Sequence, residues 1–422
     1  MTSLTTPPAA RRMAPVDEQL SVLMWGTDFG DASTRQTMER ELAELLEQDR
    51  PLRVYCGYDP TDVDLHIGHT ITFRKLRQFQ SFGHDVTFLI GNFTGLVGDP
   101  SDKDRTRPML SPDQLAANSQ TYAAQAFRIL DPERTTVVHN ADWLGKLSFA
   151  EVIALSSKFT VAQFLERDNF QLRWQRHEAI HLSEFMYALM QAYDAVEMET
   201  DVQIGGTDQL FNLLAGRTLQ REAGQRPQVV ITTPLLVGTD GTQKMSKSLG
   251  NFVAVNDVPN DMYGKVMSVP DSALDEYFTL LTDLNESEVR AVLDAVDAGE
   301  MPPMDAKKRL ALEVTRSMYP DGEAEAAQSY FESTIQRSET PDEMEQFVLP
   351  SDGAEDSGRR LDRVLVAAGV AASGGEVRRL VKQGAVSING TRTDDFATEL
   401  QAGDEIKVGR HRFLRVVAAG SA

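Results

Sequence analysis

The sequence predicts an α/β protein in which a doubly wound parallel sheet is followed by a helical domain and a small α+β domain. Three observations indicate this fold class. Short runs of strand-forming residues alternate with longer helical stretches up to about residue 267. From about 268 to 346 the strand pattern stops, and helix-length segments such as 305–318 remain. The C-terminal segment is basic, whereas the rest of the chain is acidic. Alternating strands and helices are typical of a parallel sheet that binds ligands at the carboxyl ends of its strands.

The α/β region begins after an N-terminal arm. Residues 1–33 lack periodicity, and we expect them to be loosely held. Ser33 or Thr34 could cap the following helix, which carries apolar residues on one face, namely Met38, Leu42, Leu45 and Leu46. A later helix begins at Ser111-Pro112-Asp113-Gln114, a capping box with proline at the first helical position. Five runs are expected as strands: 52–56, 86–90, 135–138, 202–204 and 229–237.

Composition places the domain boundaries. We expect the α/β domain over 34–267 and the helical domain over 268–350, followed by a small, acidic linker over 351–358. Residues 358–415 contain eleven Lys and Arg against seven Asp and Glu, which leaves +4 in a chain of net charge −21. The rest of the chain therefore carries about −25. We expect residues 359–422 to form a separate domain.

The overall composition narrows the class of protein. The 422 residues suggest two or three domains, and 41% hydrophobic with 25% charged residues is ordinary for a globular protein. A net charge of −21 means that any contact with nucleic acid needs a local basic patch. The single cysteine, Cys56, excludes a disulfide scaffold or a Cys-rich zinc site. Without a membrane-length apolar run or a secretion signal, we expect a cytoplasmic protein that binds no membrane.

The first candidate site is Asp64-Leu65-His66-Ile67-Gly68-His69, where a strand turns into a helix. Two histidines at a helix start lie near the positive end of the helix dipole, where phosphate binds readily. Gly68 leaves room for a ligand ring against the backbone. The alternatives are two unrelated histidines or half of a metal site, although no sulfur or further imidazole lies nearby to complete one.

A second candidate site is Lys244-Met245-Ser246-Lys247-Ser248, which follows the turn 238–241. Two lysines on a loop of this kind form a mobile cation clamp, suited to a polyphosphate whose charge shifts during reaction. Taken alone, the pentapeptide also fits a charged surface loop. About 175 residues after the histidine motif, in an α/β chain, phosphate chemistry is favoured.

With the signatures HIGH at 66–69 and KMSKS at 244–248, the sequence resembles the class I aminoacyl-tRNA synthetases. Four further segments narrow the resemblance to the bacterial tyrosyl-tRNA synthetases: 55–61 (YCGYDPT), 98–101 (GDPS), 187–194 (YALMQAYD) and 203–209 (QIGGTDQ). The resemblance runs from about residue 35 to 418. It implies a Rossmann-like catalytic domain, a helical domain near the anticodon and a C-terminal S4 RNA-binding domain. It also implies activation of L-tyrosine by ATP, release of pyrophosphate and transfer of tyrosyl to the 3′ end of tRNA(Tyr).

The resemblance assigns a tyrosine pocket. It implies that Asp99, Tyr187 and Gln191 bind the ammonium group, with Gln209 also in the pocket, and that Tyr55 and Asp194 bind the phenol hydroxyl. A carboxylate is a selective partner for that hydroxyl, because phenylalanine would leave it buried and unpaired. The spacing i, i+4, i+7 places Tyr187, Gln191 and Asp194 on one helix face, which also fits an ordinary amphipathic helix with a polar side.

The same resemblance assigns the nucleotide site. Catalytic roles fall to Thr61, His66, His69, Lys103, Lys244 and Lys247. ATP contacts fall to Cys56, Gly57, Asp59, His66, Gly68, His69, Gly206, Asp208, Lys244, Met245 and Lys247. From the residues alone, the Gly-Gly-Thr-Asp turn could equally be a helix N-cap formed by Thr207 or Asp208. The loop after Asp99 departs from the family at Asp102, where glycine is usual, so that either Arg105 or Arg107 could assist. We expect Mg²⁺ to arrive with ATP and no dedicated protein metal site.

The basic tail predicts an RNA-binding surface. Ser373-Gly-Gly-Glu376 reads as a capping box that starts a helix. On that helix Arg378, Arg379 and Lys382 form a basic face, while Val377, Leu380 and Val381 can pack inward. This segment resembles the S4 domain, which in the family contacts tRNA(Tyr). The alternative is a solvated helix face without a partner.

Three functions remain to be separated. A tryptophanyl-tRNA synthetase is the close rival, although the S4 tail and the pair Tyr55 and Asp194 favour tyrosine. A synthetase-like RNA-binding protein without catalysis would be expected to lose signature residues, and none is lost. The family also implies a homodimer through an insertion at about 120–185, where apolar residues could form the interface or the core: Phe149, Val152, Ile153, Phe159, Val161 and Phe164. The acidic balance could reflect adaptation to a salty cytoplasm.

Overall fold

The computed structural model describes residues 13–61, 64–101, 111–336, 344–349, 358–409 and 412–418. The chain divides into two compact units, Met1–Asp321 and Gly322–Ala422. Residues 351–357 of the predicted linker at 351–358 lie outside the described residues.

The first unit is built on a five-stranded parallel sheet. Its strands run in the order β3-β2-β1-β4-β5 and have these bounds: β1 (Arg53–Tyr58), β2 (Asp85–Ile90), β3 (Thr135–His139), β4 (Val202–Gly206) and β5 (Val229–Thr233). The register pairs Val54 with Val86 on one side and with Val202 on the other. The strand order reverses between β1 and β4, which is where ligands bind in doubly wound sheets. The predicted fold class is confirmed.

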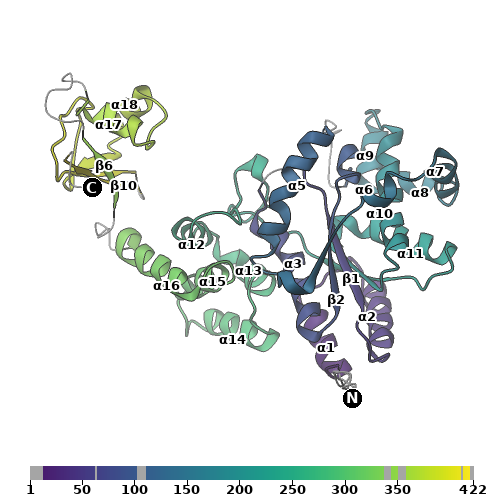
Figure 1. Ribbon diagram of the computed structural model, residues 1–422. Coiled ribbons are helices and arrows are strands. Elements are labelled where there is room, and N and C mark those ends of the chain that lie inside the picture. Colours follow the sequence, from purple (N-terminus) through teal and green to yellow (C-terminus); the bar gives the residue numbers. More distant parts are fainter. Residues whose placement is uncertain are drawn as a thin grey trace, which may run out of the picture. The chain divides into compact units, whose positions relative to one another are not determined.

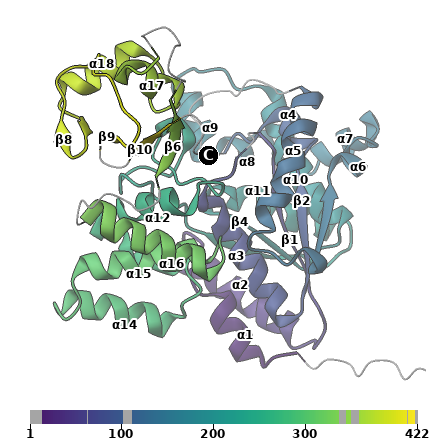
Figure 2. The same ribbon diagram turned by 60° about the vertical axis from the view of Figure 1, so that its left-hand side comes forward.

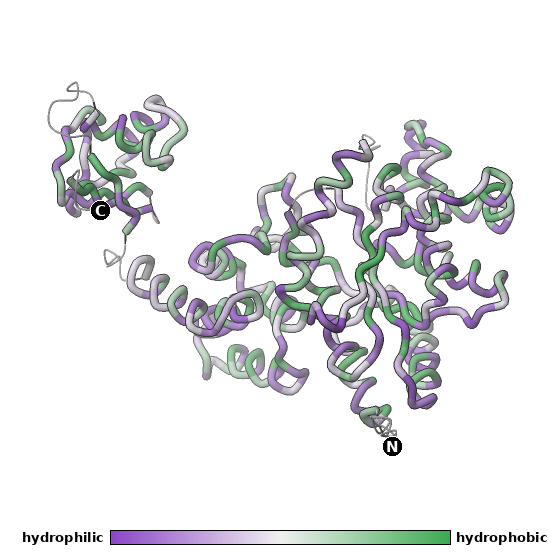
Figure 3. The backbone as a smooth tube through the Cα atoms, viewed as in Figure 1, coloured by the Kyte–Doolittle hydropathy of each residue, from purple (hydrophilic) through white to green (hydrophobic). Residues whose placement is uncertain are grey.

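All five predicted strands form, with one shortened. We expected the last strand to run to Val237, but β5 ends at Thr233. The chain turns away at Pro234, which cannot donate a backbone hydrogen bond to a neighbouring strand. Val237 instead forms an isolated bridge with Lys244. The middle residues of β1, β2, β4 and β5 are largely buried, because helices cover both faces of the sheet. Figure 3 shows hydrophobic stretches in the centre of the sheet.

Helices on opposite faces of the sheet carry the two halves of the site. Figure 1 shows α3 (Ile67–Phe82) on one side and α10 (Leu182–Glu197) with α11 (Leu210–Glu222) on the other. On the same side as α3 is α5 (Pro112–Ala126), whose predicted capping box forms between Ser111 and Gln114. Leu65 and Ile67 are fully buried, so the start of α3 is anchored in the core directly at the histidine motif.

The N-terminal segment is more ordered than we expected. From residue 16 the predicted loose arm is wrong, because α1 (Val16–Leu23) is a helix and Leu23, Met24 and Phe29 are buried. The sequence did not predict this helix, because the segment contains few apolar residues and their spacing shows no clear helical period. Residues 1–12 lie outside the described residues. In α2 (Ala32–Leu46) the predicted apolar face is buried, but Asp31 caps the helix rather than Ser33 or Thr34.

Shorter elements complete the first unit, and Figure 2 shows several of them from a second side. Around the insertion the elements are α4 (Thr94–Val97), η1 (Pro132–Arg134), α6 (Ala141–Leu144), α7 (Phe149–Ser156), α8 (Val161–Leu165) and α9 (Asp168–Gln175). Further along the chain are η2 (Thr207–Gln209), η3 (Lys247–Leu249), α12 (Pro259–Met267), η4 (Asp271–Ala273), α13 (Leu274–Leu281), α14 (Glu286–Asp297) and α15 (Pro303–Arg316). The strand-free region after 268 is helical, as expected.

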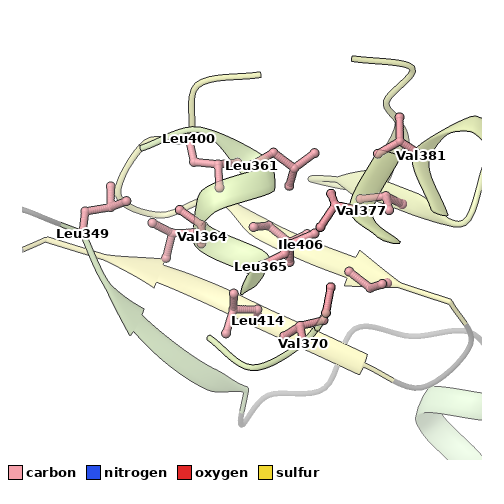
Figure 4. Close-up of a cluster of buried hydrophobic side chains, with 14 residues drawn as sticks. Leu349, Leu361, Val364, Leu365, Val370, Val377, Val381, Leu400, Ile406 and Leu414 are labelled. Atoms are coloured by element: carbon pink, nitrogen blue, oxygen red, sulfur yellow. The ribbon is translucent and has the colours of Figure 1, made fainter. Parts of the chain in front are cut away.

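The second unit has its own sheet and core. It contains α16 (Asp321–Tyr330), η5 (Phe331–Gln336), α17 (Leu361–Ala367), α18 (Gly374–Lys382) and a sheet of order β6-β10-β9-β7-β8. The strands are β6 (Glu345–Val348), β7 (Val386–Ile388), β8 (Thr391–Arg392), β9 (Glu405–Val408) and β10 (Arg412–Val417). Figure 4 shows its buried aliphatic cluster, in which Leu361, Val364, Leu365 and Ile406 are fully buried.

One strand of this sheet lies outside the boundary we expected. β6 pairs in parallel with β10, although its residues fall within the region assigned to the helical domain. Only Phe347 and Val348 of its four residues are apolar, and such a polar edge strand leaves no alternating signal in the sequence. Leu349, directly after it, is 3% exposed within the core cluster, so the segment belongs structurally to the C-terminal sheet.

Candidate active site

A cavity of about 290 Å³ opens where β1 and β4 end. It lies at the reversal of strand order, as expected for a doubly wound sheet. Residues from the ends of both strands, from α3, from α10 and from the loop before η3 line it. The predicted site residues among them are Tyr55, Cys56, Gly57, Asp59, Thr61, His66, Gly68, His69, Asp99, Tyr187, Gln191, Asp194, Gly206, Asp208, Gln209, Lys244 and Met245.

The innermost part of the cavity is built around Asp194, which is 1% exposed. Its carboxylate accepts hydrogen bonds from Trp143 Nε1 at 2.7 Å and from Asn140 Nδ2 at 3.2 Å. Burial raises the pKa of Asp194 to about 8, although these two donors act in the opposite direction. The carboxyl group is therefore held in place by protein donors and still has accepting capacity toward the cavity.

Tyr55 lies beside Asp194 with its hydroxyl buried. That oxygen has no hydrogen-bond partner among the residues that the structure describes. Burial, and then the charge of Asp194, raise the pKa of Tyr55 well above its ordinary value, so the hydroxyl keeps its proton. An unsatisfied buried hydroxyl in a cavity wall is costly unless a ligand meets it. A second polar group that enters here could bond both Tyr55 and Asp194.

The helix α10 presents its predicted polar face to the cavity. Tyr187, Gln191 and Asp194 all line it, as their spacing along one face predicts, while Ala188 and Leu189 pack into a separate apolar cluster. The amide oxygen of Gln191 is buried without a partner within the described part of the chain. The helix thus packs and lines the cavity at once.

Near Gln191, Asp99 is held by two donors. Gln209 Nε2 donates to Asp99 Oδ2 at 2.6 Å, and the backbone N–H of Ser101 donates to Oδ1 at 2.8 Å. Gln209, which we expected in the tyrosine pocket, lines the cavity and orients Asp99 at the same time. Both carboxylate oxygens are therefore fixed in direction.

The outer part of the cavity brings together the two histidines. The rings of His66 and His69 lie 4.0 Å apart between centroids, and the His66 backbone N–H donates to His69 Nδ1 at 3.2 Å. Burial, with added repulsion from His69, Lys247 and Lys244, lowers the pKa of His66 to about 2. His66 is therefore a neutral imidazole near neutral pH, and any bond to phosphate is a hydrogen bond without a formal charge.

At Gly68 the His66 imidazole packs closely against the backbone. A Cβ atom at Gly68 would lie 2.9 Å from His66 Nδ1, so a side chain would displace the imidazole. Cys56 lines the same part of the cavity, and burial raises the pKa of its thiol to about 12. The thiol consequently stays protonated and can act as a weak hydrogen-bond donor but not as a thiolate nucleophile.

The lysine loop lies on the same side as the histidines. The N–H of Met245 donates to the carbonyl of Leu236 at 2.8 Å, and the Met245 side chain is buried. Lys244 Nζ lies 3.6 Å from Asp208 Oδ2, and Lys247 Nζ donates to the backbone oxygen of Asp64. Of the two lysines, Lys244 lines the cavity, whereas Lys247 is not among the residues that line it and is bonded to Asp64.

The sequence did not predict the side chains that hold the site residues Asp194 and Asp59 in place. Trp143 and Asn140 bond Asp194, and Thr94 Oγ1 donates to Asp59 Oδ1 at 2.6 Å. None of these carries a signature spacing, because each acts through a contact between distant segments. Lys103, Arg105 and Arg107 lie outside the described residues.

Within the part of the chain that the structure describes, no group of three or more His, Cys, Asp and Glu side chains is arranged to hold a metal ion. No helix among those same residues has the length and apolar character needed to cross a bilayer.

Two models of known protein families match this chain. The family model for class I tRNA synthetases of the tryptophan and tyrosine type matches residues 47–336. The chain belongs to this family. A second model, for the S4 domain, matches residues 359–406 of this synthetase.

Curated relatives match nearly the whole synthetase chain. A tyrosine–tRNA ligase of Oleidesulfovibrio alaskensis is 44% identical over 95% of this chain and 99% of its own. One from Moorella thermoacetica is 44% identical over 95% of this chain and 96% of its own. A truncated mitochondrial tyrosyl-tRNA synthetase of Aspergillus nidulans has the same fold, with a TM-score of 0.60 at 23% identity over 76% of this chain and 93% of its own.

Outside the cavity, the basic face of α18 has the exposure that its pattern predicts, whereas for the insertion the sequence left surface and core open. On α18, Arg378, Arg379 and Lys382 are exposed, whereas Val377 and Val381 are buried. In the insertion the structure separates surface from core: Phe149, Ile153 and Val161 are at least 56% exposed, whereas Phe164 is buried in a cluster with Phe170. Trp174 and Leu182 add to the exposed apolar residues.

Proposed function

We propose that this synthetase is a tyrosine–tRNA ligase. It activates L-tyrosine with ATP to tyrosyl-adenylate and pyrophosphate, and then transfers the tyrosyl group to the 3′ end of tRNA(Tyr). The curated relatives that match it over 95% of its length are tyrosine–tRNA ligases. The observation that carries the substrate assignment is the buried pair of Asp194 and the unpartnered Tyr55 hydroxyl at the inner end of the cavity.

The amino acid is placed with its phenol hydroxyl between those two groups. The hydroxyl donates to the Asp194 carboxylate and accepts from Tyr55, which satisfies both at once. At the other end of the substrate, Asp99, Tyr187 and Gln191 take the ammonium group. Asp99 supplies the charge, and its two oxygens are already directed by Gln209 and Ser101. Phenylalanine would leave Asp194 and Tyr55 unsatisfied.

ATP occupies the outer part of the cavity. Asp208, Gly206, Gly57 and Cys56 surround the ribose, and Gly68 lets the adenine ring approach the backbone. The substrate carboxylate attacks the α-phosphorus, and the bond to pyrophosphate breaks. No protein nucleophile is needed, so catalysis is positioning together with stabilisation of developing charge. Donors for that charge are Thr61, His66, His69, Lys103, Lys244 and Lys247, of which Lys103 lies outside the described residues.

Magnesium fits this site only as a companion of ATP. At the phosphate end of the cavity wall, His66, His69 and Lys244 can bind phosphate oxygens, and the Asp208 carboxylate is paired with Lys244. Mg²⁺ requires oxygen ligands, which the phosphates of ATP supply. When bound, the ion neutralises phosphate charge. His66, His69 and Lys244 orient the phosphates through their own hydrogen bonds.

The S4 match and the basic face of α18 support binding of tRNA(Tyr) by the C-terminal region. Under this proposal the catalytic domain covers 34–267, a helical anticodon-side domain begins at 268, and the RNA-binding domain covers 359–422 together with β6, which pairs with β10. The exposed apolar residues of the insertion at about 120–185 support a homodimer, because such a patch is rare on a monomer. The buried single cysteine is consistent with a cytoplasmic location.

Exchange of pyrophosphate into ATP tests the function. We expect exchange with tyrosine and none with phenylalanine or tryptophan at equal concentration. Tryptophan-dependent exchange would instead favour the rival synthetase, and no exchange with any amino acid would favour a binding protein. Charging of tRNA(Tyr), compared with the variant R378A/R379A/K382A, then tests the role of α18. Loss of charging with unchanged exchange is expected.

A further inference from the structure

Arg167, at the start of α9, is a buried arginine outside the predicted site. It is 8% exposed, and its guanidinium lies 4.8 Å from the ring of Phe211 and 5.2 Å from that of Phe170. Its Nη2 donates to the hydroxyl of Ser101 at 2.6 Å. Its Nη1 is buried and has no hydrogen-bond partner in the part of the chain that the structure describes.

Another buried arginine of the insertion provides a contrast. Arg173 makes an ion pair of 2.5 Å with Glu184 and a second bond of 2.9 Å to the same carboxylate, which compensates its burial. Arg167 bonds a neutral hydroxyl instead and leaves one donor unmet. Burial lowers the pKa of Arg167, and the charges of Asp99 and Asp208 together with the two aromatic rings offset that burial only in part, so stability alone does not account for arginine at this position.

Ser101 connects Arg167 to the cavity. Its hydroxyl accepts from Arg167, and its backbone N–H donates to Asp99 Oδ1 at 2.8 Å. Gln209 holds the other oxygen of Asp99, and Asn212 Nδ2 donates to Gln209 Oε1 at 3.0 Å. A short chain of hydrogen bonds therefore runs from the guanidinium to the carboxylate that faces the cavity.

The same segment holds the loop at a second point. Asn169 Nδ2 donates to the carbonyl of Pro100 at 2.7 Å, one residue before Ser101. Two side chains at the start of α9 thus hold residues 100 and 101, one through the Pro100 carbonyl and the other through the Ser101 hydroxyl. The Pro100 carbonyl and the Ser101 N–H belong to one planar peptide group, so the bond from Asn169 fixes the direction of that N–H, and the bond from Arg167 fixes the Ser101 side chain.

We propose that Arg167 is a positioning residue that orients Asp99, through Ser101, toward the ammonium group of the amino acid substrate. The inference rests on the proposed function, since it assigns that ammonium group to Asp99. Arg167 does not line the cavity, so it acts on the substrate only through Asp99. A defect at Arg167 should therefore depend on whether the ligand carries an ammonium group.

Calorimetric binding to the full-length protein tests this with three ligands. Tyrosine and tyramine carry the ammonium group, and 3-(4-hydroxyphenyl)propionate lacks it. We expect Arg167→Met to weaken tyrosine and tyramine by about tenfold, the effect of one hydrogen bond to a charged group, and to leave the third ligand unchanged. Arg167→Lys, which retains the cation between the rings, should recover part of the loss. The exposed Arg176→Met is the matched control and should change nothing.

Ser101→Ala tests the same link without altering the buried arginine. It should produce the same ligand-selective loss, and the double variant should lose little more than either single one. Equal weakening of all three ligands, or unchanged binding of all three, would overturn the inference while leaving the proposed function intact. Wild-type protein that binds no tyrosine and supports no tyrosine-dependent exchange would instead overturn the proposed function, and this inference with it.

Discussion

The inner and outer ends of the cavity differ in how their polar groups are held. At the inner end, Asp194 is 1% exposed and bonded by two side chains that come from a separate segment. At the outer end, the Lys244 side chain is 42% exposed and paired with Asp208 at 3.6 Å. Lys247 is bonded to a backbone oxygen. One end is fixed by packing, and the other depends on contacts that a ligand can exchange.

This difference corresponds to two tasks. Discrimination between amino acids requires groups that cannot relax when the wrong substrate binds, and burial provides that rigidity. Stabilisation of a leaving pyrophosphate requires cations that move with the developing charge, which an exposed loop allows. Substitutions should therefore affect substrate selection at the inner end and the rate of activation at the outer end.

The largest effect is expected from Lys247→Met. Loss of a cation that stabilises only the transition state should lower kcat for pyrophosphate exchange by about a hundredfold to a thousandfold. The KM for tyrosine should change little, because the inner end is untouched. Lys146→Met, at an exposed lysine, is the control. A large rise in the tyrosine KM with unchanged kcat would contradict the separation of the two ends.

Asp194→Asn should reverse that pattern. Removing the carboxylate should raise the KM for tyrosine by about tenfold to a hundredfold and reduce the preference over phenylalanine. Burial raises the pKa of Asp194 from 3.8 to about 8, so the folded state loses stability progressively between these two pH values, where the unfolded chain is already ionised, and the loss is complete above about pH 8. The variant should therefore melt at a higher temperature than the wild type at about pH 8.

Asp201→Asn is the matched control for this second prediction. Burial acts to raise the pKa of Asp201, but bonds from Arg50 and Arg53 hold it below its ordinary value. Its charge therefore stabilises the fold, and its loss should lower the melting temperature without changing tyrosine selection. If Asp194→Asn also melted lower and kept its selectivity, Asp194 would be a structural residue.

The affinity for tyrosine should also depend on pH through the Asp194 carboxyl group, with a smaller change than the substitution produces. In the proposed complex the substrate hydroxyl donates to the ionised form, and protonation removes that form below a pKa of about 8. The apparent affinity should fall roughly fivefold between about pH 8 and about pH 7, as expected for one titrating group. His66 cannot produce this change, because its pKa lies near 2. A profile that is flat over this range would contradict the assignment.

Sequence reasoning found the residues that face the cavity more easily than those that support them. The histidine pair, the lysine loop and the polar face of α10 all follow short spacings along the chain, so each could be predicted. The bonds from Trp143 and Asn140 to Asp194 span 51 and 54 residues, and no local pattern contains them.

The fold shows the same division. Strands β1 to β5 come from short runs of strand-forming residues between helices and were predicted, with β5 ending early where Pro234 turns the chain. The edge strand β6 and the helix α1 were missed, because each is defined by its packing partner rather than by its own pattern. Periodicity also left open whether Phe149 and Phe164 were surface or core, and only tertiary contacts separate them.

The smallest effect is expected from Trp143→Phe, which tests the support of the inner end directly. The indole donates to Asp194 at 2.7 Å and acts to lower the pKa of that carboxyl group. Without it the pKa should rise further, so less of the carboxyl is ionised at neutral pH and the tyrosine KM should increase by about twofold to fivefold. The midpoint of the pH profile should move upward, and the defect should disappear at a pH above that midpoint.

Trp174→Phe, at an indole that is 64% exposed, is the control. A loss of affinity that is independent of pH would mean that Trp143 acts by packing alone, because only a contact to the titrating carboxyl group makes the defect depend on its protonation.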